Sequence, residues 1–146
     1  MKTVAQNRRA RFDFQITETI EAGIRLTGPE VKSCRASQIS LAGAYVSFLG
    51  GIPMLKQMKI SPYANARKEL QMEPARDREL LLKASELKRL EAMQSEKGIS
   101  IVPIEVRAGR FVKVVLGIGR GRKRLDKRER IKERSIERRL RTHGSD

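Results

Sequence analysis

The sequence predicts a mainly β fold with helical inserts, in which short antiparallel strands form a small, partly open barrel that precedes a basic C-terminal tail. Three observations support this prediction. Apolar and polar residues alternate in several stretches, which is typical of half-buried strands. Glycine or proline turns separate these stretches at short intervals, as in antiparallel hairpins. One internal stretch changes to a spacing near 3.6 residues, which indicates a helix.

Length and charge limit the size of the protein and the class of its partners. The 146 residues, 39% of them hydrophobic, suffice for one domain that folds around one core without disulfides. We place this domain at residues 1–119 and the basic tail at residues 120–146. The formal net charge of +15 favours an anionic polymer as partner, and nucleic acid above all.

The cysteine content and the N-terminus indicate the compartment. Cys34 is the only cysteine, so no internal disulfide can form, and the opening residues lack the apolar stretch of a secretory signal. No window approaches the roughly 18–20 apolar residues that cross a bilayer. We therefore expect a cytoplasmic protein without a membrane partner.

The N-terminal region predicts a strand and then a short helix. Residues 12–26 alternate between apolar and polar, which indicates a half-buried strand, with a break or bulge expected at Gly23. A Gly-Pro turn ends the strand. Residues 30–36 are expected to form one or two helical turns, because Pro29 near a helix start costs little.

The next region predicts a hairpin followed by a loop. Two β-rich runs, at residues 45–49 and 52–60, flank Gly50-Gly51, a dipeptide typical of tight hairpin turns. Residues 61–77 lose this periodicity and gain proline, asparagine and charge, which indicates a long surface loop. Loops of this length are usually functional or disordered.

The stretch from Ala75 to Gly98 predicts helix, because its apolar residues are spaced by one, three or four positions. Pro74 suits a helix start, Ser85 could cap a second helical piece, and Gly98 stands where a helix end is expected. The pattern fits either two short helices or one kinked helix.

A second hairpin is predicted at residues 99–116. Pro103 has no N–H to donate, so its strand is expected to lie at a sheet edge or to bulge there. The glycines of residues 117–121 lack the spacing of a dinucleotide-binding fingerprint. They are expected either to bring the backbone close to RNA or to serve as a flexible hinge.

The tail is dense in basic residues, with twelve Lys and Arg against five Asp and Glu from Gly117 onward. Favourable pairs four residues apart are offset by arginines that repeat at the same spacing, and the apolar stripe is thin. We therefore expect the tail to be disordered when free and helical once phosphates neutralise it. The alternative is a solvated tail that serves only solubility.

The inventory of catalytic groups is poor. His143 is the only histidine, no motif places it beside Cys34, and a small buried residue is the favoured interpretation of Cys34. The carboxylates form no metal-ligand cluster. We therefore expect no catalytic residues, no metal and no cofactor. A few rings could stack on bases, although most are expected in the core. These rings are Phe12, Tyr45, Tyr63 and Phe111.

Eight short sequence motifs, each present once, follow one another in a characteristic order and spacing over nearly the whole chain. They are residues 7–11 (NRRAR), 21–24 (EAGI), 28–33 (GPEVKS), 60–63 (ISPY), 76–82 (RDRELLL), 121–123 (GRK), 126–128 (DKR) and 131–134 (IKER). Any one of them is a weak signal, but the set is highly specific. Together they resemble the SsrA-binding protein (small protein B) family, which accompanies transfer-messenger RNA in bacterial ribosome rescue.

The resemblance implies an oligonucleotide-binding (OB)-type β-barrel with flanking helices, and a monomeric adaptor with two working surfaces. One would bind the tRNA-like domain of transfer-messenger RNA, through Asn7, Arg8, Arg9, Arg11, Glu30, Val31, Lys32, Ser33, Arg35, Gly121, Arg122 and Lys123. The other is the tail, which would enter the decoding centre and mRNA channel of a stalled ribosome. Its expected contacts are Arg124, Asp126, Lys127, Arg128, Ile131, Lys132 and Arg134.

The sequence leaves three questions open: the role of Glu30, the effect of Leu125, and the function of the protein. Glu30 could accept hydrogen bonds from RNA, organise neighbouring basic residues, or simply occupy a helix start. Leu125 stands where the family usually has His or Tyr, so a stacking contact there would be apolar or absent. A general RNA-binding or ribosomal structural protein is the alternative function, whereas the missing acid/base set disfavours an RNA-processing enzyme.

Overall fold

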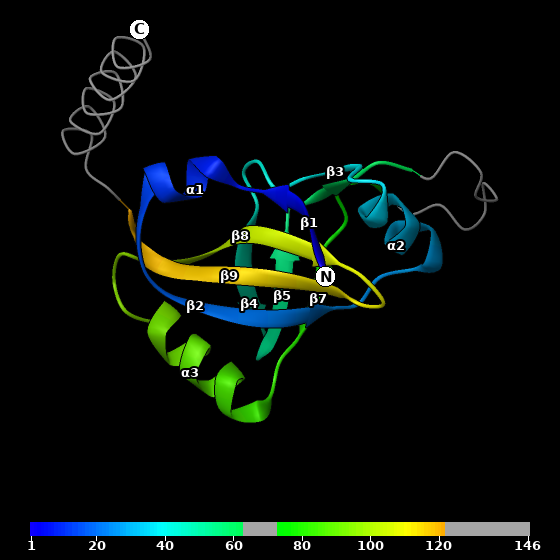
Figure 1. Cartoon of the computed structure of the whole chain (residues 1–146). Coiled ribbons are helices and arrows are strands. Elements are labelled where there is room, and N and C mark those ends of the chain that lie inside the picture. Colours follow the sequence, from blue (N-terminus) through cyan, green and yellow to red (C-terminus); the bar gives the residue numbers. More distant parts are fainter. Residues whose placement is uncertain (63–72, 122–146) are drawn as a thin grey trace, which may run out of the picture.

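A computed structural model of the chain describes residues 1–62 and 73–121. Within these ranges it contains nine strands and three helices (Figure 1). The elements are β1 (Lys2–Gln6), α1 (Arg8–Asp13), β2 (Phe14–Ile24), α2 (Gly28–Arg35), β3 (Ile39–Ser40), β4 (Tyr45–Leu49), β5 (Ile52–Lys56), β6 (Lys59–Ile60), β7 (Arg78–Leu81), α3 (Ala84–Gln94), β8 (Ile99–Ala108) and β9 (Val112–Gly121).

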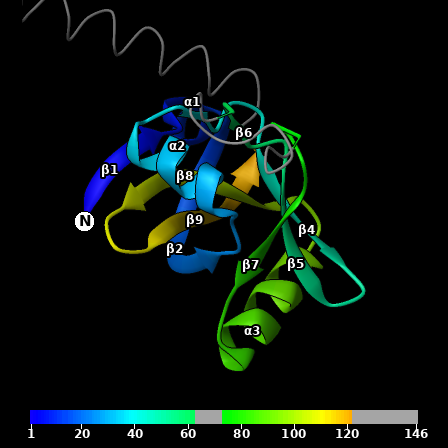
Figure 2. The same ribbon diagram turned by 90° about the vertical axis from the view of Figure 1, so that its right-hand side faces the viewer.

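Seven strands form one antiparallel sheet in the order β1-β8-β9-β2-β7-β5-β4, and β3 pairs separately with β6. The sheet curls far enough for β4 to contact β8, which lies next to the opposite edge strand. The result is a partly open barrel (Figures 1 and 2). The predicted fold class, a mainly β antiparallel barrel with helical inserts, is confirmed.

The helices lie on two sides of this barrel. Helices α1 and α2 lie on the same side, near its opposite ends, whereas α3 lies on the other side (Figures 1 and 2). Helix α3 is anchored by Leu90, which is fully buried in the main core. This arrangement leaves the solvent-facing sides of α1 and α2 available to a partner.

The core follows the alternation seen in the sequence. On β9, Val114, Leu116 and Ile118 are buried, while Val115 between them is only half-buried. Inward residues of this kind from most strands merge into one apolar cluster. A smaller second cluster lies beneath α1 and consists of Ala10, Val102 and Ile104.

Both predicted hairpins are present. Gly50 and Gly51 join β4 to β5 with φ of 59° and 82°, a left-handed conformation that glycine adopts without strain. Strands β8 and β9 form the second hairpin. The register of β8 shifts between Pro103 and Glu105, so the bulge expected at the proline is confirmed.

The glycines at the end of β9 have a different role from the one expected. Gly117 and Gly119 lie inside the strand, paired with β2. A Cβ on Gly119 would lie 2.1 Å from the carbonyl oxygen of Gln15, so no side chain fits there. The hinge interpretation is therefore wrong for these two positions. Gly119 instead lets the backbones of β9 and β2 approach closely, and Gly117 leaves room for the side chains of Ile16 and Ile104.

The N-terminal elements differ from the prediction. The strand expected from residue 12 begins at Phe14, because residues 8–13 form α1, and β1 was not predicted. Gly23 does not interrupt β2, since it pairs with Leu81 on one side and with Lys113 on the other. Phe12 belongs to the helix, so its alternation with Phe14 was coincidental.

The helix expected from residue 75 is also corrected. Its first part forms β7, whose residues pair with β2 and β5. Only Ala84–Gln94 is helical, as α3, and its N-cap is Lys83 rather than Ser85. The sheet pairing overrides the helical spacing because Leu80 points into the barrel core, where it is 2% exposed. Gly98 does adopt a left-handed φ, of 84°, between α3 and β8.

Two predictions fall outside the described residues. The central part of the long loop, residues 63–72, is one of them. The tail from Arg122 onward is the other. The prediction that this tail is disordered when free and helical when bound therefore also falls outside the described residues. All predicted tail contacts, and Leu125, belong to this second range.

Candidate nucleic-acid interface

The first group of predicted RNA contacts is carried by α1. Its arginines, Arg8, Arg9 and Arg11, are all exposed, while Ala10 on the opposite side of the helix is buried. The guanidinium carbon of Arg9 lies 5.5 Å from the centre of the Phe12 ring. A six-residue helix is too short to be stable alone, so tertiary contacts must hold these charges in place.

Asn7 supplies those contacts. Its side-chain oxygen accepts a hydrogen bond from the Ala10 N–H at 3.2 Å and so caps α1. Its side-chain nitrogen donates to the carbonyl oxygens of Leu41 and Pro103, at 3.3 and 3.0 Å. Asn7 thus joins the helix start to two other segments, and it positions the arginines of α1.

Two adjoining hollows lie beside α1. The larger, of about 580 Å³, runs between Arg8 and the residues around Ser40. The smaller, of about 330 Å³, is bounded by Arg9 and Phe14 and ends at Tyr45. Tyr45, one of the rings that could stack on bases, is 41% exposed. Arg8 and Arg9 line the larger hollow together with one acidic residue, Asp13, which lies 3.5 Å from Arg9. Arginine side chains near an exposed aromatic ring are suited to RNA.

The second group of predicted contacts is carried by α2, which begins with a capping box. The Thr27 hydroxyl accepts from the Glu30 N–H, and the Glu30 carboxylate accepts from the Thr27 N–H at 2.9 Å. Pro29 stands in the first turn, as expected from the sequence. Thus the helix start is fixed by local residues alone.

Glu30 is also the centre of a buried ion cluster. Its carboxylate accepts from Arg76 Nε at 3.1 Å and from Arg78 Nε at 2.8 Å. Arg78 is fully buried and donates further to the carbonyl oxygens of Met58, Pro74 and Arg76. The cluster therefore ties α2 to strand β7 and to Met58, which directly precedes β6.

The electrostatics of this cluster keep Glu30 ionised. Burial alone would raise the pKa of Glu30, but hydrogen bonds from Arg76, the Thr27 N–H and Arg78 outweigh it, so the pKa is lowered. Burial also lowers the pKa of Arg78, and Glu30 opposes this effect. The carboxylate is 6% exposed and is held by protein donors. Glu30 thus organises neighbouring basic residues and occupies a helix start, which are two of the three roles that the sequence allowed for this residue.

The rest of α2 divides by burial. Lys32 and Arg35 are exposed, Val31 is half-buried, and Ser33 and Cys34 are buried. Consequently Lys32 and Arg35 are the residues of this segment whose charges face solvent. The guanidinium of Arg35 also donates to the carbonyl oxygens of Gly109 and Arg110 in the β8–β9 turn, which holds its charged group beside that turn.

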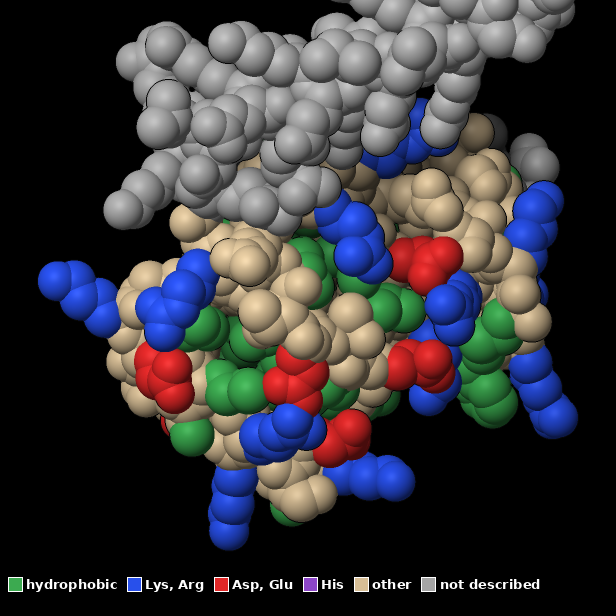
Figure 3. Space-filling view, turned by 60° about the vertical axis from the view of Figure 1, so that its left-hand side comes forward, with side chains coloured by type: hydrophobic (Ala, Val, Ile, Leu, Met, Phe, Trp, Pro, Cys, Tyr) green, Lys and Arg blue, Asp and Glu red, His purple; other side chains and the backbone are tan. Residues whose placement is uncertain are grey.

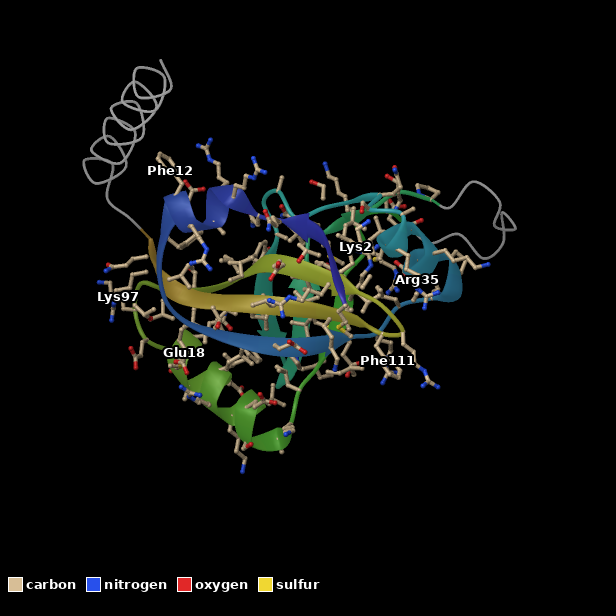
Figure 4. All side chains as sticks on the ribbon, viewed as in Figure 1. Lys2, Phe12, Glu18, Arg35, Lys97 and Phe111 are labelled. Atoms are coloured by element: carbon tan, nitrogen blue, oxygen red, sulfur yellow. The ribbon has the colours of Figure 1, made fainter. Side chains whose placement is uncertain are left out.

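The root of the tail lies beside α1. Gly121, the last residue of β9, is exposed and pairs with Phe14, which directly follows α1. Hence the structure brings the start of the predicted tail next to the first group of arginines. Figure 4 shows Phe12 at this end of the barrel, with Arg35 and Phe111 at the other.

The charges on other faces are paired more evenly. Acidic and basic side chains lie side by side over the face seen in Figure 3. Arg89 of α3 forms an ion pair with Glu18 of β2, and Arg107 of β8 lies 3.9 Å from Glu21 of β2. Such pairs reduce the positive potential there, so the side carrying α1 and α2 is the better candidate for binding RNA.

Several residues of the interface were missed by the sequence. Arg76 and Arg78 were noted only as part of a family stretch, and a charged residue wholly in the core has no sequence signature. Phe111, one of the rings that could stack on bases or lie in the core, is 63% exposed. Phe12 is half-buried, and Tyr63 lies outside the described residues.

The candidates for chemistry are not arranged for it. Cys34 is fully buried, as expected, and burial raises the pKa of its thiol to about 11, so the nucleophilic thiolate is suppressed. In the described parts of the chain, no group of three or more His, Cys, Asp and Glu side chains could hold a metal ion. The helices found there lack the length and apolar content that crossing a bilayer requires.

Comparison with known proteins identifies relatives along nearly the entire chain. The family model described as SmpB protein matches residues 4–145. The SsrA-binding protein of Lactobacillus helveticus (strain DPC 4571) is 46% identical over 139 residues, which are 94% of this chain and 91% of the relative. That of Coprothermobacter proteolyticus is 42% identical over 146 residues, which are 99% and 97% of the two chains.

A solved structure agrees with these relatives. One chain of the structure described as "tmRNA-SmpB: a journey to the center of the bacterial ribosome" matches with a TM-score of 0.70 at 38% identity. The match covers 90% of this chain and 95% of that chain. Sequence and fold therefore agree over the same length, and this chain belongs to the SmpB protein family.

Proposed function

We propose that this protein is an RNA-binding adaptor that binds the tRNA-like domain of transfer-messenger RNA and delivers it to stalled ribosomes for trans-translation. The observation that carries the proposal is membership of the SmpB family over residues 4–145, with SsrA-binding proteins as relatives. The tmRNA–SmpB structure that matches the fold supports the same partners. The adaptor acts in the cytoplasm, where ribosomes translate.

The basic side of the barrel is where the tRNA-like domain binds. Arg8, Arg9 and Arg11 of α1 and Lys32 and Arg35 of α2 are exposed on helices that lie on one side (Figures 1 and 2). Arginine and lysine on short, capped helices can follow an RNA backbone without reading its sequence. Asn7, Glu30 and Ser33 act through the positions of these cations rather than by touching RNA.

The tail binds the ribosome. Its root at Gly121 lies beside α1, so residues 122–146 begin at the edge of the RNA-binding side. Their high density of Lys and Arg suits the small-subunit decoding centre and the mRNA channel, which are lined by phosphates. The same chain then holds transfer-messenger RNA with its barrel and the ribosome with its tail.

Removal of residues 123–146 tests this division of labour. The truncated protein should bind the tRNA-like domain with nearly the affinity of the full chain, measured by filter binding. It should fail to support tagging of stalled nascent chains in a reconstituted translation reaction. Equal loss of both activities would sink the two-surface proposal.

A general RNA-binding protein is the second candidate, because a protein with a net charge of +15 can bind many RNAs. A competition binding experiment distinguishes these two functions. An unrelated structured RNA of equal length, in excess, should fail to displace the tRNA-like domain from the adaptor but would displace it from a general binder.

The adaptor has no catalytic step of its own. Its single cysteine is buried with a raised pKa, which supports this part of the proposal. Labelled RNA incubated with the protein and divalent metal should therefore remain uncleaved and unmodified.

A further inference from the structure

A cleft lies between α2 and the β8–β9 turn, at the opposite end of the barrel from α1. Its lining includes Leu26, Val31, Leu81, Arg110, Phe111 and Lys113, and we call it the Phe111 cleft. Its volume is about 210 Å³. This is below the roughly 300–1,000 Å³ of sites that enclose whole drug-sized ligands, and it suits a single planar ring.

We propose that the Phe111 cleft binds one unstacked nucleobase of the RNA partner, with Phe111 as its stacking surface. The inference rests on the proposed function, because it assumes that the partner is a structured RNA. It adds a site of which only the ring itself was a candidate residue in the sequence.

The Phe111 cleft exposes large apolar side chains to solvent. Phe111 is 63% exposed and Leu81 is 46% exposed, although both are large apolar residues. Figure 4 shows Phe111 projecting from the turn, at the same end of the barrel as Arg35. Adjacent exposed apolar side chains over a half-buried floor of Leu26 and Val31 mark a binding surface.

The backbone that carries the Phe111 ring is held in a hydrogen-bonded turn. The Gly109 N–H donates to the Phe111 carbonyl at 3.0 Å and closes the turn. Arg35 of α2 donates through Nε to the Gly109 carbonyl at 3.1 Å and through Nη2 to the Arg110 carbonyl at 3.4 Å. The turn and α2 therefore move as one unit, so little conformational freedom is lost when a base stacks on the ring.

The charge around the Phe111 cleft is positive. The only charged residues that line the cleft, among those the structure describes, are Arg110 and Lys113, and both are basic. The Arg110 guanidinium carbon lies 5.9 Å from the centre of the Phe111 ring. An aromatic surface edged by cations is the combination that holds an unpaired base together with its flanking phosphate.

The size of the cleft excludes the main competing occupant. A stable protein interface buries roughly 800 Å² on each partner, whereas only two large apolar side chains are exposed here. An acidic peptide would pair with the charges of Arg110 and Lys113 but would leave the Phe111 ring uncovered. A nucleobase with its phosphate would stack on the ring and also pair with these charges.

Substitution of Phe111 tests the proposal on the transcribed tRNA-like domain of transfer-messenger RNA. Phe111→Leu keeps an apolar side chain but removes the π face, and should weaken binding by about 5- to 100-fold, the range for one lost base–aromatic stack. Phe111→Tyr should restore the affinity. Ile52→Ala is the matched control, because Ile52 is 49% exposed on the β4–β5 hairpin, away from the cleft.

Two further readouts separate stacking from charge and from misfolding. Phe111→Leu should leave the slope of log affinity against log salt unchanged, whereas Arg110→Ala should reduce it by about one unit, the contribution of one phosphate contact. Chemical probing should reveal one base that the wild-type protein protects and Phe111→Leu leaves reactive. Unchanged circular dichroism would show that the variants are folded.

The outcomes distinguish this inference from the proposed function. If the wild-type protein prefers the tRNA-like domain but Phe111→Leu binds it equally well and protects the same bases, the Phe111 cleft is not a base site and the adaptor function stands. If the wild-type protein shows no preference for this RNA, the proposed function itself fails.

Discussion

The two basic helices, α1 and α2, present similar charges on the same side of the barrel but are held there in different ways. Helix α1 depends on the neutral side chain of Asn7, which makes three hydrogen bonds to backbone groups. Helix α2 depends on the ionised side chain of Glu30, buried between Arg76 and Arg78. One anchor is polar and partly exposed, and the other is an ion cluster with a fully buried arginine.

Two helices that display similar charge can therefore differ in how much stability is lost when their anchoring residue is substituted. Loss of a neutral cap costs about 1 kcal/mol in a typical helix. Removal of one partner from a buried ion pair costs about 3–5 kcal/mol, because the remaining charge is left without compensation. We therefore expect the α2 end of the interface to be the more sensitive to substitution and to pH.

The largest effect is expected from Glu30→Gln, which leaves the buried guanidinium of Arg78 without its counter-charge. The free energy of unfolding, measured by urea titration, should fall by about 3–5 kcal/mol. Glu79→Gln is the matched control, because Glu79 pairs with exposed Arg25 at 3.6 Å and exposed pairs contribute less than about 1 kcal/mol. Equal losses in the two variants would contradict the role given to the cluster.

Asn7→Ala should have the next largest effect, a loss of about 1–2 kcal/mol in the free energy of unfolding. Asn7→Ser separates the contributions, since its hydroxyl can still accept from the Ala10 N–H as an N-cap but is too short to replace the donor to both Leu41 and Pro103. It should therefore fall between wild type and Asn7→Ala. A loss as large as that of Glu30→Gln would abolish the proposed contrast.

Acid should weaken α2 before α1. The pKa of Glu30 is lowered in the folded protein, so its contribution to stability is complete above the unfolded value of about 4.3 and is lost as the pH falls through the folded pKa. The stability difference between wild type and Glu30→Gln should thus shrink below about pH 4. The difference between wild type and Asn7→Ala should not, and a parallel decline of both would refute the assignment.

The smallest effects on stability are expected for the exposed cations themselves. Arg8→Ala and Lys32→Ala should each change the free energy of unfolding by less than about 0.5 kcal/mol. Each should nevertheless weaken binding of the tRNA-like domain and lower its salt slope by about one unit. Lys88→Ala, on α3 on the other side of the barrel, is the control and should leave the slope unchanged.

Most of the sheet could be predicted because its signals are local. Alternating residues and the Gly50-Gly51 turn identify the β4–β5 hairpin without knowledge of its neighbours. The α2 start could be predicted for the same reason, since Pro29 and Glu30 act within one turn. In each case the residues that determine the structure are close together in the chain.

The missed elements depend on distant residues. Helix α1 is stabilised by the hydrogen bonds from Asn7 to Leu41 and Pro103. These partners are distant in the chain, so the residues around position 8 do not indicate the bonds. Strand β7 begins with Arg78, a residue type that hydropathy places outside the core, and the partner that makes its burial possible is 48 residues earlier. The site residues that could not be predicted are of the same long-range kind.

The burial of Cys34 has a practical consequence for experiments on this protein. Its thiol is 0% exposed and its pKa is raised to about 11, so it should react slowly with maleimides near neutral pH. A second cysteine introduced at a surface position can therefore carry a fluorescent or spin label selectively, without mutation of the native one. Cys34 should thus not compete with the introduced cysteine for the label.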